Sequence, residues 1–137
     1  MSARGDLEAW LIKIAAPLRA TITINPSVWN LRSFTRFVSV YIDLPGGYSP
    51  SAISLSSVSM NGVPAITDPR YDFASNPRVY LVDIYRDGVL ERLVKFDALA
   101  LRSAVRPTGG RATLTLTGTV SDVLFHGSAT VRVLFGP

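Results

Sequence analysis

The chain has 137 residues, of which 47% are hydrophobic and 18% charged, which is typical of one globular domain and argues against an intrinsically disordered chain. It contains no cysteine, so disulfides and thiolate metal sites are excluded. The formal net charge of +4 is spread over basic residues that form no run, which favours a solvated basic surface over a nucleic-acid interface.

The first eighteen residues form an apolar segment ahead of the predicted domain, which we place at residues 19–137. The apolar side chains of this segment are Leu7, Trp10, Leu11, Ile12 and Ile14. All but Ile12 recur at the spacing of one helix face, with Asp6 positioned to cap the helix and Pro17 to end it. The alternation of residues 10, 12 and 14 fits an extended strand as well, so both conformations stay open.

The apolar segment is too short to span a bilayer, and it lacks the basic region of a signal peptide. It carries more apolar surface than a free tail should, and burial yields about 25 cal/mol per Å². We therefore expect it to dock on protein, and on another copy rather than in cis, giving a homo-oligomer or a filament.

From residue 20 onward the hydrophobic pattern has a period of two, which is typical of strands with one buried face. The predicted strands cover residues 22–24, 38–44, 78–85, 89–96, 112–117 and 129–135, and a further short strand ends at Asn61-Gly62. We expect a loop over residues 67–77 and a helical turn over residues 98–105, capped by Asp97. The residues expected to face one core are Val38, Val40, Ile42, Leu114, Leu116, Val131 and Val133.

About seven short strands separated by turn signals predict an all-β domain, with an antiparallel β-sandwich as the leading architecture. Three stretches of the chain also resemble a module of archaeal and bacterial secreted or surface proteins. They comprise residues 24–48, which include the run VSVYIDLPGGY, then residues 83–97, and finally residues 114–133, which end in FHGSATVRV. The resemblance covers roughly residues 22–133.

The resemblance implies an immunoglobulin-like accessory module without an activity of its own, located outside the cell or at its surface. Twelve of the fourteen basic residues are Arg and Gln is absent, a bias compatible with a thermophilic or GC-rich source. Fold does not fix function, so the sites must be weighed residue by residue.

The family pattern has a D-x-D-x-D-G arrangement typical of calcium loops, in which carboxylates at alternate positions supply oxygen ligands. This chain keeps Asp83 and Asp87 and has Glu91 at the last acidic place, but Tyr85 and Arg86 stand where the family has a carboxylate and a neutral neighbour. The lost carboxylate and the added guanidinium both weaken calcium binding, because affinity depends on the ligand charge.

A plain hairpin offers an alternative for the same stretch. If residues 87–88 form a two-residue turn, Asp83 lies directly opposite Arg92, and such a cross-strand pair contributes roughly 0.2 to 1 kcal/mol. We therefore expect this hairpin and no cofactor, with calcium held by Asp83, Asp87 and Glu91 as the alternative.

The residues offer little support for an enzyme. His126 is the only His, so no His cluster for a metal can be built, and a lone His beside Phe125 is typical of a strand residue. Asp68, Asp72 and Asp97 could supply a carboxylate pair for glycoside hydrolysis, but acids in loops are common on any soluble surface.

Our leading interpretation is a non-catalytic structural or adhesive module that acts through protein contacts, within a surface protein or an extracellular assembly. The second is a carbohydrate-binding module that uses exposed aromatic rings as a platform. The aromatic residues that could lie outside the core are Trp29, Tyr48, Tyr71, Phe73 and Tyr80. A nucleic-acid binder driven by the basic surface is the third and weakest.

Overall fold

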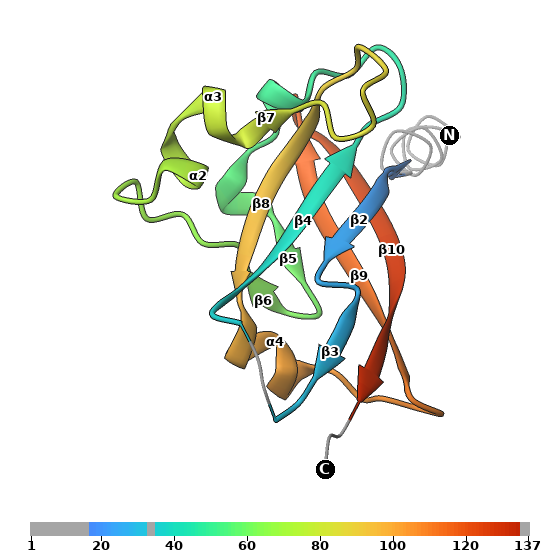
Figure 1. The fold of residues 1–137 in the computed structure, drawn as a ribbon. Coiled ribbons are helices and arrows are strands. Elements are labelled where there is room, and N and C mark those ends of the chain that lie inside the picture. The colour runs from blue at the N-terminus through green and yellow to red at the C-terminus, as the bar shows by residue number, and fades with distance from the viewer. Residues whose placement is uncertain (1–16, 33–34, 135–137) are drawn as a thin grey trace, which may run out of the picture.

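The computed structural model describes residues 17–32 and 35–134, and these form two packed β-sheets. The larger sheet contains β1 (Leu18–Arg19), β10 (Val123–Leu134), β9 (Arg111–Val120), β5 (Ser59–Met60) and β6 (Val63–Pro64) in that order, and β3 (Val28–Asn30) pairs with the far end of β10. The smaller sheet has the order β2 (Thr21–Asn25), β4 (Phe37–Asp43), β8 (Glu91–Asp97) and β7 (Leu81–Val82). Figure 1 shows β2, β4 and β8 in one layer with β9 and β10 behind it. The predicted sandwich is confirmed at this level.

The core lies between the two sheets and is built from the predicted alternation. All seven residues assigned to it are at most 2% exposed, because the period of two along β4, β9 and β10 turns every second side chain inward. Trp29 fills the same core with no exposed area, and its indole Nε1 donates to the Pro26 carbonyl at 2.7 Å.

Residues 18–30 switch from the larger sheet to the smaller one and back. They pair with β10 as β1, cross to pair with β4 as β2, and return to β10 as β3. The Ala20 amide donates to the His126 carbonyl at 2.7 Å at the crossing. A Cβ on Gly127 would lie 2.8 Å from the Ala20 carbonyl oxygen, so this close approach requires glycine.

Short helices connect the strands: η1 (Pro50–Ala52), η2 (Leu55–Ser57), α2 (Asp72–Ser75), α3 (Pro77–Tyr80) and α4 (Ala98–Ala104). The Asp97 carboxylate caps α4 by accepting from the Ala100 amide at 2.8 Å, as predicted. At residues 61–62 both φ angles are positive, which confirms the predicted turn.

Three local predictions are wrong in the stretch that leads into β8. Residues 78–80 were expected to begin a strand but belong to α3, because Pro77 favours the first helical turn and the Asn76 side chain caps it by accepting from the Arg78 amide at 3.0 Å. The expected loop over residues 67–77 contains α2, and the strand expected from residue 89 begins at Glu91.

Candidate functional site

The loop formed by residues 83–90 joins β7 to β8, and it does not have the expected hairpin register. Leu81 pairs with Arg92, and the ladder ends one residue later. The predicted pairing of Asp83 with Arg92 is therefore wrong. The Asp83 carboxylate instead accepts from the Asp87 amide at 3.1 Å and from the Gly88 amide at 2.9 Å. Such side-chain-to-backbone bonds give the chain an alternative to the ladder.

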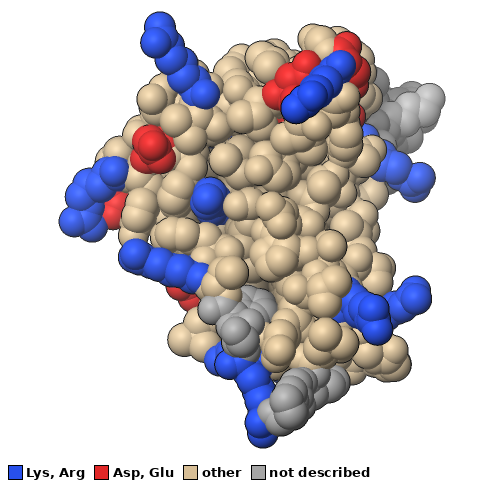
Figure 2. All heavy atoms as spheres, in the orientation of Figure 1, with Lys and Arg blue, Asp and Glu red and all other residues tan. Residues whose placement is uncertain are grey.

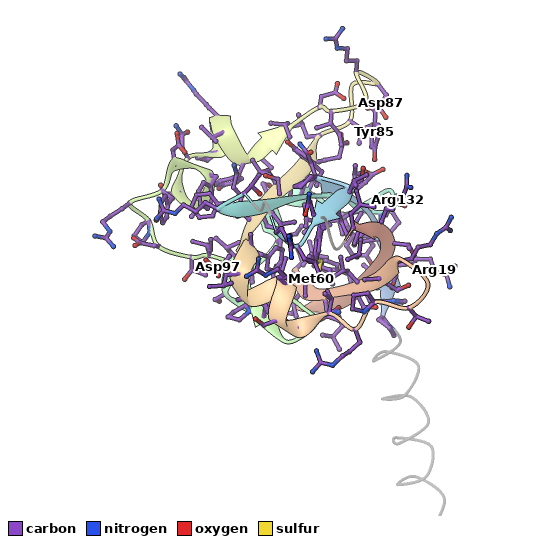
Figure 3. The ribbon with its side chains drawn as sticks, turned by 60° about the horizontal axis from the view of Figure 1, so that its bottom comes forward. Arg19, Met60, Tyr85, Asp87, Asp97 and Arg132 are labelled. Carbon is purple, nitrogen blue, oxygen red and sulfur yellow. The ribbon has the colours of Figure 1, made fainter. Side chains whose placement is uncertain are left out.

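The altered register brings three carboxylates together. One oxygen atom from each of Asp83, Asp87 and Glu91 can be chosen so that all lie within 4.8 Å of one another. Asp83 and Asp87 come from the 83–90 loop and Glu91 from the first position of β8. We call this group the acidic cluster. Figure 3 shows Asp87 and Tyr85 together at the outer end of the loop.

Glu91 is the buried member of the acidic cluster, with no exposed surface. Its Oε1 accepts from the Ile84 amide at 2.9 Å, whereas its Oε2 is buried without a hydrogen-bond partner. Leaving a buried charged oxygen unsatisfied costs free energy, so a hydrogen-bond donor or a cation at Oε2 would stabilise the cluster.

The neighbouring arginine does not supply that positive charge. Arg92 follows Glu91 on β8, so its side chain points to the other face of the strand. There its guanidinium lies 3.7 Å from the centre of the Tyr80 ring, and Nη1 reaches the Pro50 carbonyl at 3.4 Å. Arg92, which was expected to pair with Asp83, therefore interacts with Tyr80 and Pro50 instead.

The electrostatics of the cluster follow from this arrangement. Burial raises the pKa of Glu91, the Ile84 amide lowers it in part, and the charges of Asp43, Asp87 and Asp83 raise it further. The hydrogen bond from the Gly88 amide is the main cause that lowers the pKa of Asp83. The cluster thus holds an ionised carboxylate beside one whose ionised form is disfavoured.

A divalent cation fits this donor set. Calcium binds oxygen at 2.3–2.6 Å, so oxygen ligands on opposite sides of one ion are about 5 Å apart. The 4.8 Å limit of the acidic cluster is compatible with one shared ion. An ion bound through Glu91 Oε2 would give that oxygen a partner and reduce the repulsion among the carboxylates.

The 83–90 loop also carries apolar side chains into solvent. Tyr85, Val89 and Leu90 are 48%, 51% and 45% exposed, and they are three of the seven large hydrophobic residues exposed within the described parts of the chain. We call these three residues the apolar loop patch. The Tyr85 hydroxyl is hydrogen-bonded to Thr23 of β2, which anchors the loop on the smaller sheet.

Sequence reasoning missed the apolar loop patch because Val89 was assigned to a strand. A usable signal was present, since two aliphatic residues directly follow Asp87-Gly88, a pair typical of turns. The residues that were predicted to contact a partner, Leu7, Trp10, Leu11, Ile12 and Ile14, lie outside the described residues.

The residues considered for catalysis have the following positions in the fold. His126 is on β10, paired with Thr117 of β9 and with Arg19 of β1. Asp68 forms a salt bridge with Arg70 at 2.7 Å. Asp72 begins α2 and Asp97 caps α4.

The candidate sugar-binding aromatics are mostly engaged within the fold. The prediction that they lie outside the core is wrong for Trp29, and Phe73 is only 7% exposed. Tyr71 stacks on Phe73 with ring centroids 4.9 Å apart, and Tyr80 lies under the Arg92 guanidinium. Tyr48 packs against the core. These contacts use the ring surfaces that a sugar platform would need free.

Comparison with known proteins adds no assignment: no family model, curated protein or solved structure matches this chain. Among the described residues, no helix is both long and apolar enough to cross a membrane.

Proposed function

We propose that this chain is a non-catalytic, immunoglobulin-like structural or adhesive module that acts through protein contacts in a surface protein or extracellular assembly. The partner that we infer is another copy of the same chain. The apolar loop patch is the observation that carries this proposal, because it gathers half-exposed Tyr85, Val89 and Leu90 on one loop.

The fixed shape of the 83–90 loop supports the same function. The Asp83 carboxylate binds the amides of Asp87 and Gly88, and the Asp87 carboxylate binds the Val89 amide at 2.9 Å. A pre-organised loop loses less conformational entropy when it binds a partner than a mobile one does. The patch is therefore presented in a form suited to recognition.

We also propose that calcium is held by Asp83, Asp87 and Glu91 and stabilises this loop. The buried, unpartnered Oε2 of Glu91 supports the proposal. The two-residue turn that was the alternative is not formed, because the ladder ends at Val82. The aromatic sugar platform, the second function considered, loses its support because Trp29 is buried.

Sedimentation velocity of the full chain over a range of concentrations tests the protein contact. The double variant Val89→Ser/Leu90→Ser should lower the average mass, because it removes the apolar surface at the contact. The matched control is Leu99→Ser in α4, a 59% exposed leucine outside the 83–90 loop, which should leave the mass unchanged.

A second arm of the sedimentation experiment uses a chain that lacks residues 1–16. This truncation keeps β1, because that strand begins at Leu18. The truncated chain should also show a lower mass while its β circular-dichroism signal survives. A full-length chain that stays monomeric at high concentration contradicts the proposal, and so does an equal loss of mass in the Leu99→Ser control.

A further inference from the structure

The charged residues on the strands of the larger sheet are all basic. Its six strands contain no Asp or Glu, and their basic residues are Arg19, Arg111, His126 and Arg132. The acidic cluster, by contrast, lies on the loop before the smaller sheet's β8. In the face shown by Figure 2, basic side chains are spread over the whole surface, and those at the lower right have no acidic side chain beside them.

Two of these arginines oppose each other directly. Arg111 and Arg132 are cross-strand partners in the antiparallel pair of β9 and β10, and both are exposed on the outer face of the sheet. Like charges in this position are destabilising. Within the described ranges no ion pair involves either residue, and Asp122 lies at the opposite end of the same hairpin.

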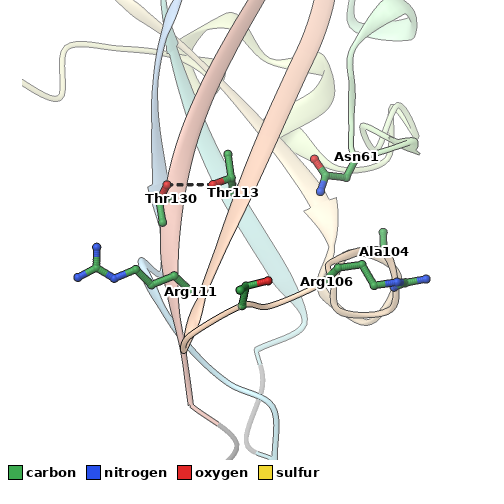
Figure 4. A pocket seen from close by; sticks show the side chains of 7 residues that line it. Asn61, Ala104, Arg106, Arg111, Thr113 and Thr130 are labelled. Atoms are coloured by element: carbon green, nitrogen blue, oxygen red, sulfur yellow. Dashed lines mark hydrogen bonds between the residues drawn. The ribbon is translucent and has the colours of Figure 1, made fainter.

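The arginine pair lies between two hollows in the surface. One, of about 320 Å³, is lined by both arginines together with Ser27 and Thr130. The other, of about 510 Å³, shares Arg111 and Thr130 with the first and adds Arg106 and Thr113. Figure 4 shows the second hollow, with Thr113 and Thr130 side by side on neighbouring strands above Arg111, and with Arg106 to the right. Their hydroxyls are 3.3 Å apart.

We propose that this end of the larger sheet binds an acidic polysaccharide, with Arg111 and Arg132 holding its carboxylate or sulfate groups. Guanidinium groups bind such oxyanions with charge-assisted, bidentate hydrogen bonds. The repulsion between the arginines, unfavourable in the free protein, is then relieved by the anion between them.

The lining distinguishes this ligand from other polyanions. The threonine and serine hydroxyls beside the arginines can exchange hydrogen bonds with sugar hydroxyls. Among the described residues, no aromatic side chain lines either hollow, so this part of the chain offers no stacking platform of the kind typical of single-stranded nucleic-acid sites. Two hollows that share a wall fit an extended ligand better than a single small anion.

The site is separate from the loop that carries the proposed protein contact. Arg111 begins β9 and Arg132 lies near the end of β10, whereas the 83–90 loop precedes β8 in the other sheet. Binding should therefore persist in the Val89→Ser/Leu90→Ser variant, and loss of one activity leaves the other testable.

Isothermal titration in EDTA provides the test, with a polygalacturonate oligomer and a heparin-derived hexasaccharide as the carboxylated and sulfated probes. A neutral dextran oligomer and a single-stranded oligonucleotide are the comparison ligands. Saturable binding of at least one acidic sugar is expected, with at least a tenfold loss of affinity in Arg111→Gln and Arg132→Gln. Arg78→Gln, at an exposed arginine of α3, should bind like the wild type.

The charge reversal Arg111→Glu sharpens the test, because it creates an opposite-charge cross-strand pair with Arg132. This variant should lose binding completely while its melting temperature holds or rises, which excludes misfolding as the cause. Absence of saturable binding overturns the proposal. An equal loss in Arg78→Gln also overturns it, as does tighter binding of the oligonucleotide than of either acidic sugar.

Discussion

The substitution Glu91→Gln should stabilise the protein when calcium is absent and destabilise it when calcium is present. Without calcium, the wild type keeps a buried carboxylate whose Oε2 has no partner. The amide of Gln can accept from Ile84 as Glu91 Oε1 does, and its NH₂ group can donate toward Asp83 or Asp87. The variant should therefore be the more stable protein in EDTA.

The size of this gain follows from the cost of an unsatisfied buried polar group, about 1 to 3 kcal/mol. We expect the lower end, about 1 kcal/mol, because Asp87 beside it is exposed to water and solvent screens the repulsion.

Calcium should invert the order. An ion that binds only the folded wild type at 100 times its Kd adds about 2.7 kcal/mol to the free energy of unfolding. The variant lacks the buried carboxylate ligand and should gain far less. Subtracting the variant's advantage in EDTA from the stabilisation of the wild type by calcium leaves the wild type the more stable protein by about 1 to 2 kcal/mol.

Urea unfolding at pH 7, followed by circular dichroism in EDTA and in excess calcium, measures both differences. Asp72→Asn, at an exposed carboxylate in α2, should respond to calcium like the wild type. The reasoning is refuted if calcium leaves the wild type unchanged and Glu91→Gln is the less stable protein in EDTA.

Three further predictions test the electrostatics and the packing. Burial raises the pKa of Glu91 in the folded state, so the folded state binds more protons than the unfolded one. In EDTA, the stability of the wild type relative to Glu91→Gln should therefore fall as pH rises from the unfolded pKa of Glu91 through its folded pKa. A difference that stays flat across pH 4–8 would contradict this. Leu116→Ala removes a fully buried side chain and should cost about 2 to 5 kcal/mol in urea unfolding; a loss below about 0.5 kcal/mol would disprove the assigned strand face. Gly127→Ala should cost about 1 to 3 kcal/mol of stability, because its Cβ would lie less than 3.0 Å from the Ala20 carbonyl and from Ile22. Gly46→Ala is the control and should be tolerated, because a Cβ there has no neighbour within 4 Å.

Much of the sandwich was predictable from local patterns. The alternation of β4, β9 and β10 identified the buried faces, and the cap at Asp97 and the turn at Asn61-Gly62 follow from short-range side-chain chemistry. Pairing across the sheets is different in kind, because it depends on contacts between distant segments. The passage of residues 18–30 from β10 to β4 and back therefore left no local signal.

The acidic cluster shows where a local pattern misled. A turn at Asp87-Gly88 predicted a plain hairpin, but the Asp83 carboxylate competes for the amides of Asp87 and Gly88, so the ladder ends at Val82. The change of register places Arg92 opposite Leu81 rather than Asp83. Burial of Glu91 and the pairing of Arg111 with Arg132 likewise need the tertiary structure to be seen.

Hydrogen exchange of the full chain at low and high protein concentration tests the proposed protein contact most directly, because it locates any contact along the chain. If copies associate through the apolar loop patch, amides in residues 85–90 should become more protected as concentration rises, and Val89→Ser/Leu90→Ser should remove that gain. Exchange in this loop that is independent of concentration, or a gain confined to the outer face of β9 and β10, would contradict the account.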